Sequence, residues 1–246
     1  MLKQPDHKFT MACDFLQHIR PGGPWTLTAI IPDGRTETKT VTSAEAVIRF
    51  IREHNGTRNL YFTINRLKRA KTSKPSKFDF AAVEYLHADL DPRHDETPED
   101  AKARYRAAIA ALGLEPFAQV DSGNGIQVLY RLAETTDDFD AAEARSLALT
   151  LKLGGPPGTQ NIDRVFRIPG TTNIPNKVKL EHGRTICEST LISTSTTSHP
   201  LDGSLRQSNH HLKTTQRPKT SKSRSRNRPV ATRHLRSSRL HCQPIC

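Results

Sequence analysis

Hydrophobic and polar positions along the chain alternate with the period of a β-strand in several short segments. Four such strands are expected, over residues 25–31, 36–41, 60–64 and 85–91, with a turn at Pro32-Asp33-Gly34. A further pair of strands, 117–121 and 126–132, flanks Ser122-Gly123-Asn124-Gly125. Because glycine accepts the backbone angles of a tight turn, this pair is predicted to form a β-hairpin.

Three other segments combine apolar residues at helical spacing with signals for helix ends. They are 43–54, which ends at Asn55-Gly56; 97–112, with Thr97 as its cap and Gly113 as its end; and a helix capped by Asp140. The buried stripe of the last helix is predicted to be Ala144, Leu147, Ala148 and Leu151. Strands interspersed with helices indicate an α+β or mixed α/β domain with a central sheet.

The net charge of +12 is concentrated at the C-terminal end. Of the 37 Lys and Arg residues, eleven follow Asp202, so the first 202 residues hold 26 basic and 25 acidic side chains. Apolar periodicity also vanishes late in the chain. We therefore expect a folded domain over 1–185 and a basic tail over 186–246 that is disordered.

Two explanations of this tail remain open. A basic arm would bind nucleic acid by releasing counterions. Alternatively, its Ser, Arg, His and Pro content, with no acidic residue after Asp202, is typical of an out-of-frame extension.

Cysteine usage and hydropathy limit the setting. The four cysteines form no CxxC pair, and no apolar run is long enough for a membrane span or a signal peptide. We expect a cytoplasmic protein with reduced thiols and no membrane partner.

Asp89 and Asp91 are the first candidates for chemistry. Both lie at the end of the strand 85–91 and point to the same face, because side chains alternate along a strand. Pro92 ends the strand directly after them. Two carboxylates on one face suit a hard divalent cation such as Mg²⁺.

Three more features could complete a site. Backbone N–H groups of the turn 122–125 can approach a phosphate closely. Asp163 lies beside another predicted strand, and Arg167 and Lys177 add positive charge after it. The loop 66–77 precedes the Asp89 strand, and its basic side chains are candidates for template phosphates: Lys71, Lys74 and Lys77.

Taken in order, these motifs resemble the archaeo-eukaryotic primase superfamily, in particular the RepB-like primase-polymerase domains of phage and plasmid replication proteins. The resemblance covers about residues 12–185. It rests on Leu86-His87-Ala88-Asp89-Leu90-Asp91, on Asp121-Ser122-Gly123-Asn124-Gly125-Ile126-Gln127, and on Asn161-Ile162-Asp163 with Arg167-Ile168-Pro169-Gly170-Thr171-Thr172-Asn173 and Lys177.

The resemblance implies a two-lobed fold whose catalytic lobe has an RNA-recognition-like sheet. It also implies that Asp89, Asp91 and Asp163 hold two Mg²⁺ or Mn²⁺ ions. The residues that would meet the nucleotide are Ser122, Gly123, Gly125, Gln127, Arg167 and Lys177. Two metal ions can activate a 3′-hydroxyl and stabilise the leaving pyrophosphate.

Gln127 departs from the family pattern, in which a histidine usually ends the second motif. Glutamine carries no charge, so it would hold a triphosphate less strongly than a protonated histidine, unless Arg131 on the same strand face compensates. His87 shares the Asp89 face, and we expect it at the surface or packed in the core rather than beside the metal.

The expected function is therefore a nucleotidyltransferase that uses nucleoside triphosphates to make or extend a primer on single-stranded DNA. A catalytically degenerate domain that only binds nucleic acid remains the alternative, and a metal-dependent nuclease would use the same carboxylates. The sequence contains no GxxxxGK[ST] phosphate loop, so we expect the chain to be a fragment of a longer protein or to work with a separate helicase.

Overall fold

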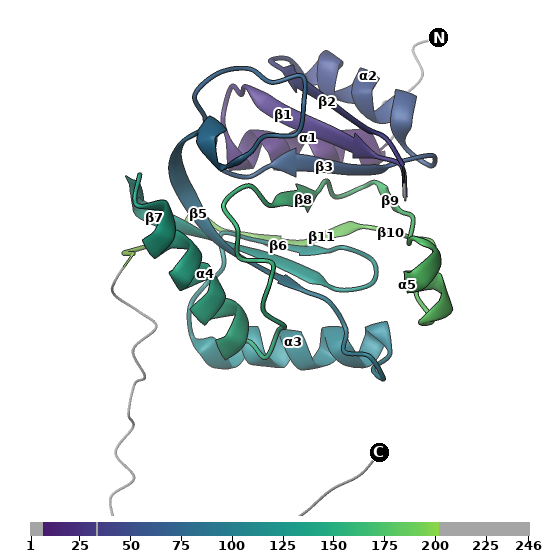
Figure 1. The fold of residues 1–246 in the computed structure, drawn as a ribbon, viewed down its shortest axis with the longest axis vertical. Coiled ribbons are helices and arrows are strands. Elements are labelled where there is room, and N and C mark those ends of the chain that lie inside the picture. Colours follow the sequence, from purple (N-terminus) through teal and green to yellow (C-terminus); the bar gives the residue numbers. More distant parts are fainter. Residues whose placement is uncertain (1–6, 33, 202–246) are drawn as a thin grey trace, which may run out of the picture. The chain divides into compact units, whose positions relative to one another are not determined.

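The computed structural model describes residues 7–32 and 34–201, which fold around two large β-sheets (Figure 1). The first sheet is antiparallel, in the order β2 (Thr36–Val41), β1 (Trp25–Ile30), β3 (Asn59–Thr63), β8 (Val165–Arg167). The second has the order β11 (Thr190–Thr194), β6 (Ala118–Asp121), β7 (Ile126–Thr136), β5 (Phe80–Leu90), β4 (Arg66–Leu67), with β12 (Ser198–His199) beside β7. A small ladder joins β9 (Thr172–Asn173) to β10 (Cys187–Glu188).

Helices cover both sheets and create two hydrophobic cores. The helices α1 (His7–Ile19) and α2 (Ala44–His54) pack on the first sheet, where Phe15, Phe50 and Phe62 are buried. The helices α3 (Pro98–Leu112) and α4 (Phe139–Lys152) pack on the second sheet, where Tyr105 and Leu149 are buried. A short helix, α5 (Lys177–Glu181), follows β9, and one 3₁₀ turn, η1 (Lys77–Asp79), precedes β5.

The strand β5 belongs to both cores because its side chains alternate. Leu86, Ala88 and Leu90 face the α3/α4 core, whereas Tyr85 joins the core of the first sheet. This alternation confirms that Asp89 points away from the apolar face. It also places the end of β5 between the two sheets.

The expected α+β fold with a central sheet is confirmed, and so are most of its elements. Ser43 caps α2 and Thr97 caps α3, each accepting a hydrogen bond from a backbone N–H group in the first turn. Gly113 ends α3 with φ +69°, a left-handed angle that glycine tolerates. The predicted hairpin is formed by β6 and β7.

One helix was not expected, and two expectations about another helix are wrong. The segment 7–19 forms α1, which the sequence pattern had not indicated. In α4 the cap is Asp138 rather than Asp140, and the buried residues include Ser146 and Thr150, while Leu151 is 52 % exposed. The Thr150 hydroxyl donates to the Ser146 carbonyl oxygen. This bond satisfies the Thr150 hydroxyl inside the core, where the helix turns a face other than its predicted apolar stripe.

The boundary of the folded domain also lies later than residue 185. The strand β11 pairs with β6, and Ser189 is fully buried, donating from its hydroxyl to the carbonyl oxygens of Ile168 and Thr171. Residues 186–201 are therefore part of the fold, and the expectation of a disordered tail there is wrong. The rest of the expected tail, 202–246, lies outside the described residues.

No helix within residues 7–32 and 34–201 is long and apolar enough to cross a membrane.

The later boundary predicts a difference between two truncations. A chain ended at Thr185 loses β10–β12 and the buried hydrogen bonds of Ser189. We expect it to be at least about 3 kcal/mol less stable than a chain ended at Leu201, since each buried hydrogen bond contributes about 1 kcal/mol and apolar burial adds more. Urea denaturation followed by circular dichroism measures this, and equal midpoints would contradict the assignment.

Candidate functional site

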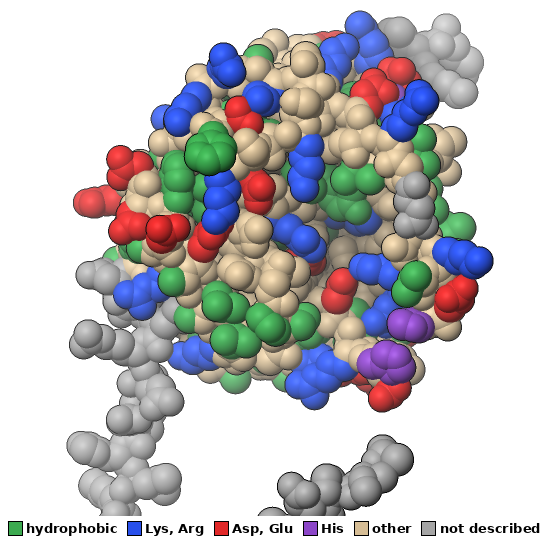
Figure 2. Space-filling view, viewed as in Figure 1, with side chains coloured by type: hydrophobic (Ala, Val, Ile, Leu, Met, Phe, Trp, Pro, Cys, Tyr) green, Lys and Arg blue, Asp and Glu red, His purple; other side chains and the backbone are tan. Residues whose placement is uncertain are grey.

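A polar cleft of about 330 Å³ lies where the end of β5 meets β7, β8 and β9. Figure 2 shows a hollow in this face, with basic and acidic side chains beside it, near where Figure 1 draws β8, β9 and α5. Its charged and polar lining comprises Asn59, Tyr61, Lys74, Asp89, Asp91, Ser122, Asn124, Gln127, Arg164, Arg167, Asn173, Asn176 and Lys179.

Asp89 is the buried acid of this cleft. Its side chain accepts a hydrogen bond of 3.0 Å from Gln127 Nε2 and forms an ion pair with Arg164. Burial raises the pKa of Asp89, but the charge and hydrogen bonds of Arg164 and Gln127 outweigh burial and hold the pKa below its usual value. Asp89 is therefore ionised at neutral pH.

Asp91 is the second carboxylate, and it is more open to solvent. Its Oδ2 lies 3.0 Å from Lys179 Nζ, and both side chains are about half exposed. The Tyr105 hydroxyl donates to the Asp91 carbonyl oxygen at 2.8 Å, which fixes the backbone where β5 ends. The Asp91 backbone is thus fixed by Tyr105, while its half-exposed carboxylate pairs with Lys179.

Gln127 connects the two sheets across the cleft. While its Nε2 donates to Asp89, its Oε1 accepts from the backbone N–H group of Arg167 at 2.9 Å. Both ends of the amide are engaged, so Gln127 positions Asp89. The possible compensation by Arg131 does not occur, because its guanidinium lies 5.4 Å from the Phe117 ring centre and lines a separate cavity.

Arg167 is buried, with only 4 % of its surface exposed. Its two Nη atoms donate to oxygens of Asn59, Tyr61, Thr172 and Asn173 at 3.0–3.3 Å. These donors are already used within the protein. Arg167 therefore supplies a fixed positive charge to the cleft, rather than the open fork that the sequence suggested.

The turn 122–125 contributes shape more than hydrogen bonds. The N–H group of Ser122 donates to the Gly125 carbonyl oxygen, and that of Gly123 donates to Asp121. These two N–H groups are thus not available to a phosphate. A Cβ atom on Gly125 would lie 2.5 Å from the Leu90 carbonyl oxygen, so only glycine lets this turn approach the end of β5.

Most of the lysine side chains that were expected to meet phosphates do not line the cleft. Lys74 lines the cleft and is exposed, whereas Lys71 pairs with Asp79 at 2.7 Å and Lys77 with Glu143 at 2.6 Å. Lys177 does not line the cleft, and Lys179, one half-turn later on α5, lines it instead.

Asp163 is not brought to the cleft either. The hydrogen bond that Lys77 donates to Glu143, together with the nearby charge of Asp163, raises the pKa of Lys77, which lies beside α4. Among the described residues, the ligand atoms of Asp89, Asp91 and Asp163 do not all lie within 4.8 Å of one another. The neighbouring Arg164 enters the cleft in its place.

His87 is packed in the interior, as one of the two expected placements has it. Its ring contacts Phe166 edge-on at 5.4 Å, and its Nε2 lies 2.9 Å from the Thr159 carbonyl oxygen. Burial lowers the pKa of His87 to about 4, so it is neutral at physiological pH.

Sequence reasoning missed several cleft residues, of which Arg164, Lys179 and Tyr61 matter most. Asn59 and Tyr61 lie two residues apart on β3 and therefore share one face of the strand, and this polar pair was a signal that could have been used. Arg164 carried no such signal, because its partner Asp89 is 75 residues away.

Comparisons with solved structures show the fold. A cyanophage S-2L primase-polymerase AEP domain matches with a TM-score of 0.56 and 16 % identity, over 78 % of this chain and 93 % of that one. Primase RepB′ matches with a TM-score of 0.53 and 12 % identity, over 78 % of this chain and 58 % of that one.

The catalytic domain of RepB′ in complex with initiator DNA gives a TM-score of 0.54 and 12 % identity, over 78 % of this chain and 88 % of that chain. No protein-family model and no curated protein sequence matches the chain. The chain therefore has the fold of archaeo-eukaryotic primase-like domains, as its motifs had suggested.

The pair of Asp89 and Arg164 predicts a pH-dependent stability change. In Arg164→Gln, burial still acts on the carboxylate, and only the hydrogen bond of Gln127 and the charge of Lys179 remain to oppose it, so the pKa of Asp89 rises and its ionised form is less stable at neutral pH. We expect a loss of about 2 kcal/mol at pH 7, less than for a fully buried pair because the Arg164 side chain is 38 % exposed.

This loss should shrink as the pH falls and Asp89 becomes protonated. Urea denaturation of both proteins from pH 7 to pH 4 measures it. The exposed Arg49→Gln serves as a control for removal of a positive charge, and a pH-independent difference would contradict the prediction.

Proposed function

We propose that this protein is a divalent-cation-dependent nucleotidyltransferase of the primase-polymerase type. It would use nucleoside triphosphates to synthesise or extend a primer on single-stranded DNA during replication of a phage, plasmid or other mobile element. The observation that carries the proposal is the joint placement of Asp89 and Asp91 in one cleft with four basic side chains: Lys74, Arg164, Arg167 and Lys179.

The charge of the cleft favours a triphosphate. Its lining contains four basic and two acidic side chains, so it is positively charged before any ion binds. A bound divalent cation would make the cleft more positive, so that its charge would come closer to balancing the negative charge of a nucleoside triphosphate. Catalysis of phosphoryl transfer depends mainly on such positioning and charge neutralisation.

The carboxylates fit a divalent cation. Asp89 is ionised, and both acids present the oxygen ligands that Mg²⁺ and Mn²⁺ prefer. In the structure, Arg164 and Lys179 pair with the two carboxylates where a cation would bind. Both basic side chains are partly exposed and long enough to turn toward phosphate oxygens. The donors present suit one shared cation, and they do not form the three-carboxylate set expected for two.

Each group then has a role. A bound cation would polarise the reacting phosphate and lower the pKa of the primer 3′-hydroxyl. Asp89, oriented by Gln127, and Asp91 would hold it. Arg167 would provide a fixed positive charge, and Lys179 and Lys74, which are exposed, would contact the triphosphate and the template strand.

The assignment predicts different results for two acidic residues. Asp89→Asn should lower primer synthesis in Mg²⁺ or Mn²⁺ by at least about 100-fold, since removing a charge that acts in the transition state costs several kcal/mol. Asp163→Asn, which removes the same charge outside the cleft, should lower it less than about 10-fold. Incorporation of labelled nucleotide on a single-stranded template measures both.

Circular dichroism of both variants must show an intact fold. Full activity of Asp89→Asn would refute the proposed function. An equal loss in Asp163→Asn would return Asp163 to the metal-binding set and require the segment before β8 to move.

A second candidate function is binding of nucleic acid without catalysis. The ion pair of Asp89 with Arg164 favours it, because the guanidinium already neutralises the carboxylate, and Gln127 adds no positive charge for a triphosphate. One of the similar structures was solved with initiator DNA.

The two candidates differ in one pair of assays. We expect the wild-type protein to retain single-stranded DNA on a filter and also to incorporate nucleotides on that DNA. Lys74→Ala should weaken both, because Lys74 is an exposed cation at the cleft. Retention of DNA with no incorporation in Mg²⁺ or Mn²⁺ would favour the binding function.

A further inference from the structure

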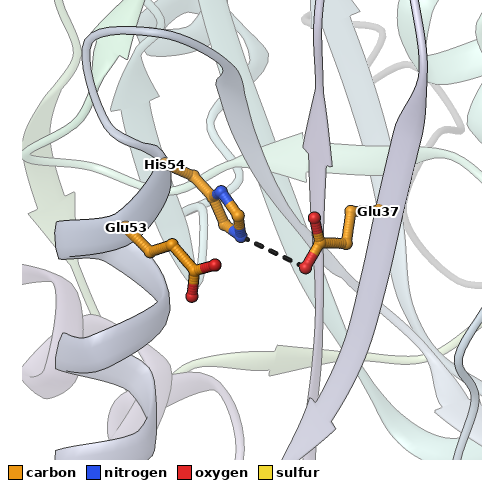
Figure 3. A group of neighbouring side chains, drawn as sticks. All are labelled: Glu37, Glu53 and His54. Atoms are coloured by element: carbon orange, nitrogen blue, oxygen red, sulfur yellow. Dashed lines mark ion pairs between the residues drawn. The ribbon is translucent and has the colours of Figure 1, made fainter.

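A second group of metal-ligating side chains lies on the first sheet, away from the residues that line the cleft. Glu37 on β2 and Glu53 and His54 at the end of α2 each offer one ligand atom, and these three atoms lie within 4.8 Å of one another. Figure 3 shows the His54 ring and the two carboxylates directed toward a common space between β2 and α2. None of the three lines the cleft.

His54 gives this group its significance. The residue is only 2 % exposed, yet its Nε2 atom is buried without a hydrogen bond. Buried polar atoms normally have a hydrogen-bond partner, because losing water without one costs free energy. The nearest carboxylate oxygen, Oε1 of Glu37, lies 3.5 Å away, too far to satisfy this nitrogen well.

We propose that Glu37, Glu53 and His54 bind a divalent transition-metal ion such as Zn²⁺ that joins β2 to the end of α2. An imidazole nitrogen with two carboxylates suits Zn²⁺ or Co²⁺, whereas Mg²⁺ prefers oxygen ligands alone. Ligand atoms around a tetrahedral Zn²⁺ lie about 3.4 Å apart. The two exposed glutamates need only small rotations to reach this spacing.

Neighbouring groups support a cation here. The end of α2 presents carbonyl oxygens whose partial negative charge attracts cations. Arg58 pairs with Oε2 of Glu37 at 2.7 Å, so Oε1, the oxygen nearer His54, stays available for the ion. A ligand carboxylate held by a hydrogen bond on its other oxygen is a common arrangement around protein metal ions.

The ion would stabilise a segment that also supports the cleft. The residue after His54 is Asn55, whose Oδ1 accepts from the N–H group of Thr172 at 2.8 Å. Asn59, four residues later, accepts from Arg167 Nη1 at 3.0 Å. Metal binding should therefore raise the thermal stability of this region as well as neutralise the two glutamates.

Titration of the untagged full chain with Co²⁺ in excess Mg²⁺ tests the proposal, since Mg²⁺ occupies oxygen-only sites. Visible absorption of four- or five-coordinate Co²⁺ should appear and saturate at one equivalent. Glu53→Gln should weaken binding by more than about 10-fold, and because Glu53 is exposed this variant should fold. Glu134→Gln, an exposed charge-matched control on β7, should bind like the wild type.

A second measurement and a second variant make the outcome decisive. Zn²⁺ should raise the melting temperature of the wild type and of Glu134→Gln, but not that of Glu53→Gln. Asp89→Asn should keep the Co²⁺ band, whatever its effect on primer synthesis, so this test is independent of the proposed function. Absence of the band in the wild type, its persistence in Glu53→Gln, or its loss in Asp89→Asn would each overturn the proposal.

Discussion

One side chain, Gln127, holds the two sheets together at the place where the acids are displayed. The strand β8 is an edge of the first sheet, and its Arg167 N–H group has no neighbouring strand to donate to on the side that faces the second sheet. Gln127 satisfies that donor with Oε1 and orients Asp89 with Nε2. An unpaired edge donor and a buried carboxylate are both costly, and one amide relieves both.

This role changes the meaning of the residue that departs from the family pattern. The Gln127 amide is buried, and its nitrogen and its oxygen both form hydrogen bonds within the protein. The positive charge of the cleft comes instead from Arg164 and Lys179, which pair with the carboxylates, and from the fixed Arg167. The cleft is thus organised as interlocked ion pairs, which the divalent cation and the triphosphate of the proposed function would together replace.

Much of this arrangement could be predicted locally. The strand alternation that puts Asp89 and Asp91 on one face, the caps at Ser43 and Thr97, and the turn at Gly125 each depend on a few neighbouring residues. The C-terminal boundary of the fold could not be predicted locally, because β11 resembles a polar Ser/Thr segment and becomes a strand only by pairing with β6. Partly buried and exposed residues alternate along this edge strand, so its hydrophobic pattern is weak.

The sequence by itself determined the longer strands β1–β3 and β5–β7, the helices α2–α4 and the identity of the two acids at the end of β5, because local backbone preferences and side-chain periodicity act over short distances. Only the tertiary structure decided which distant charges meet them. Arg164 enters the cleft while Asp163 stays outside, and Lys179 enters while Lys177 does not. Residues so close along the chain differ only in the direction their side chains take, and that direction is set by packing between the two sheets.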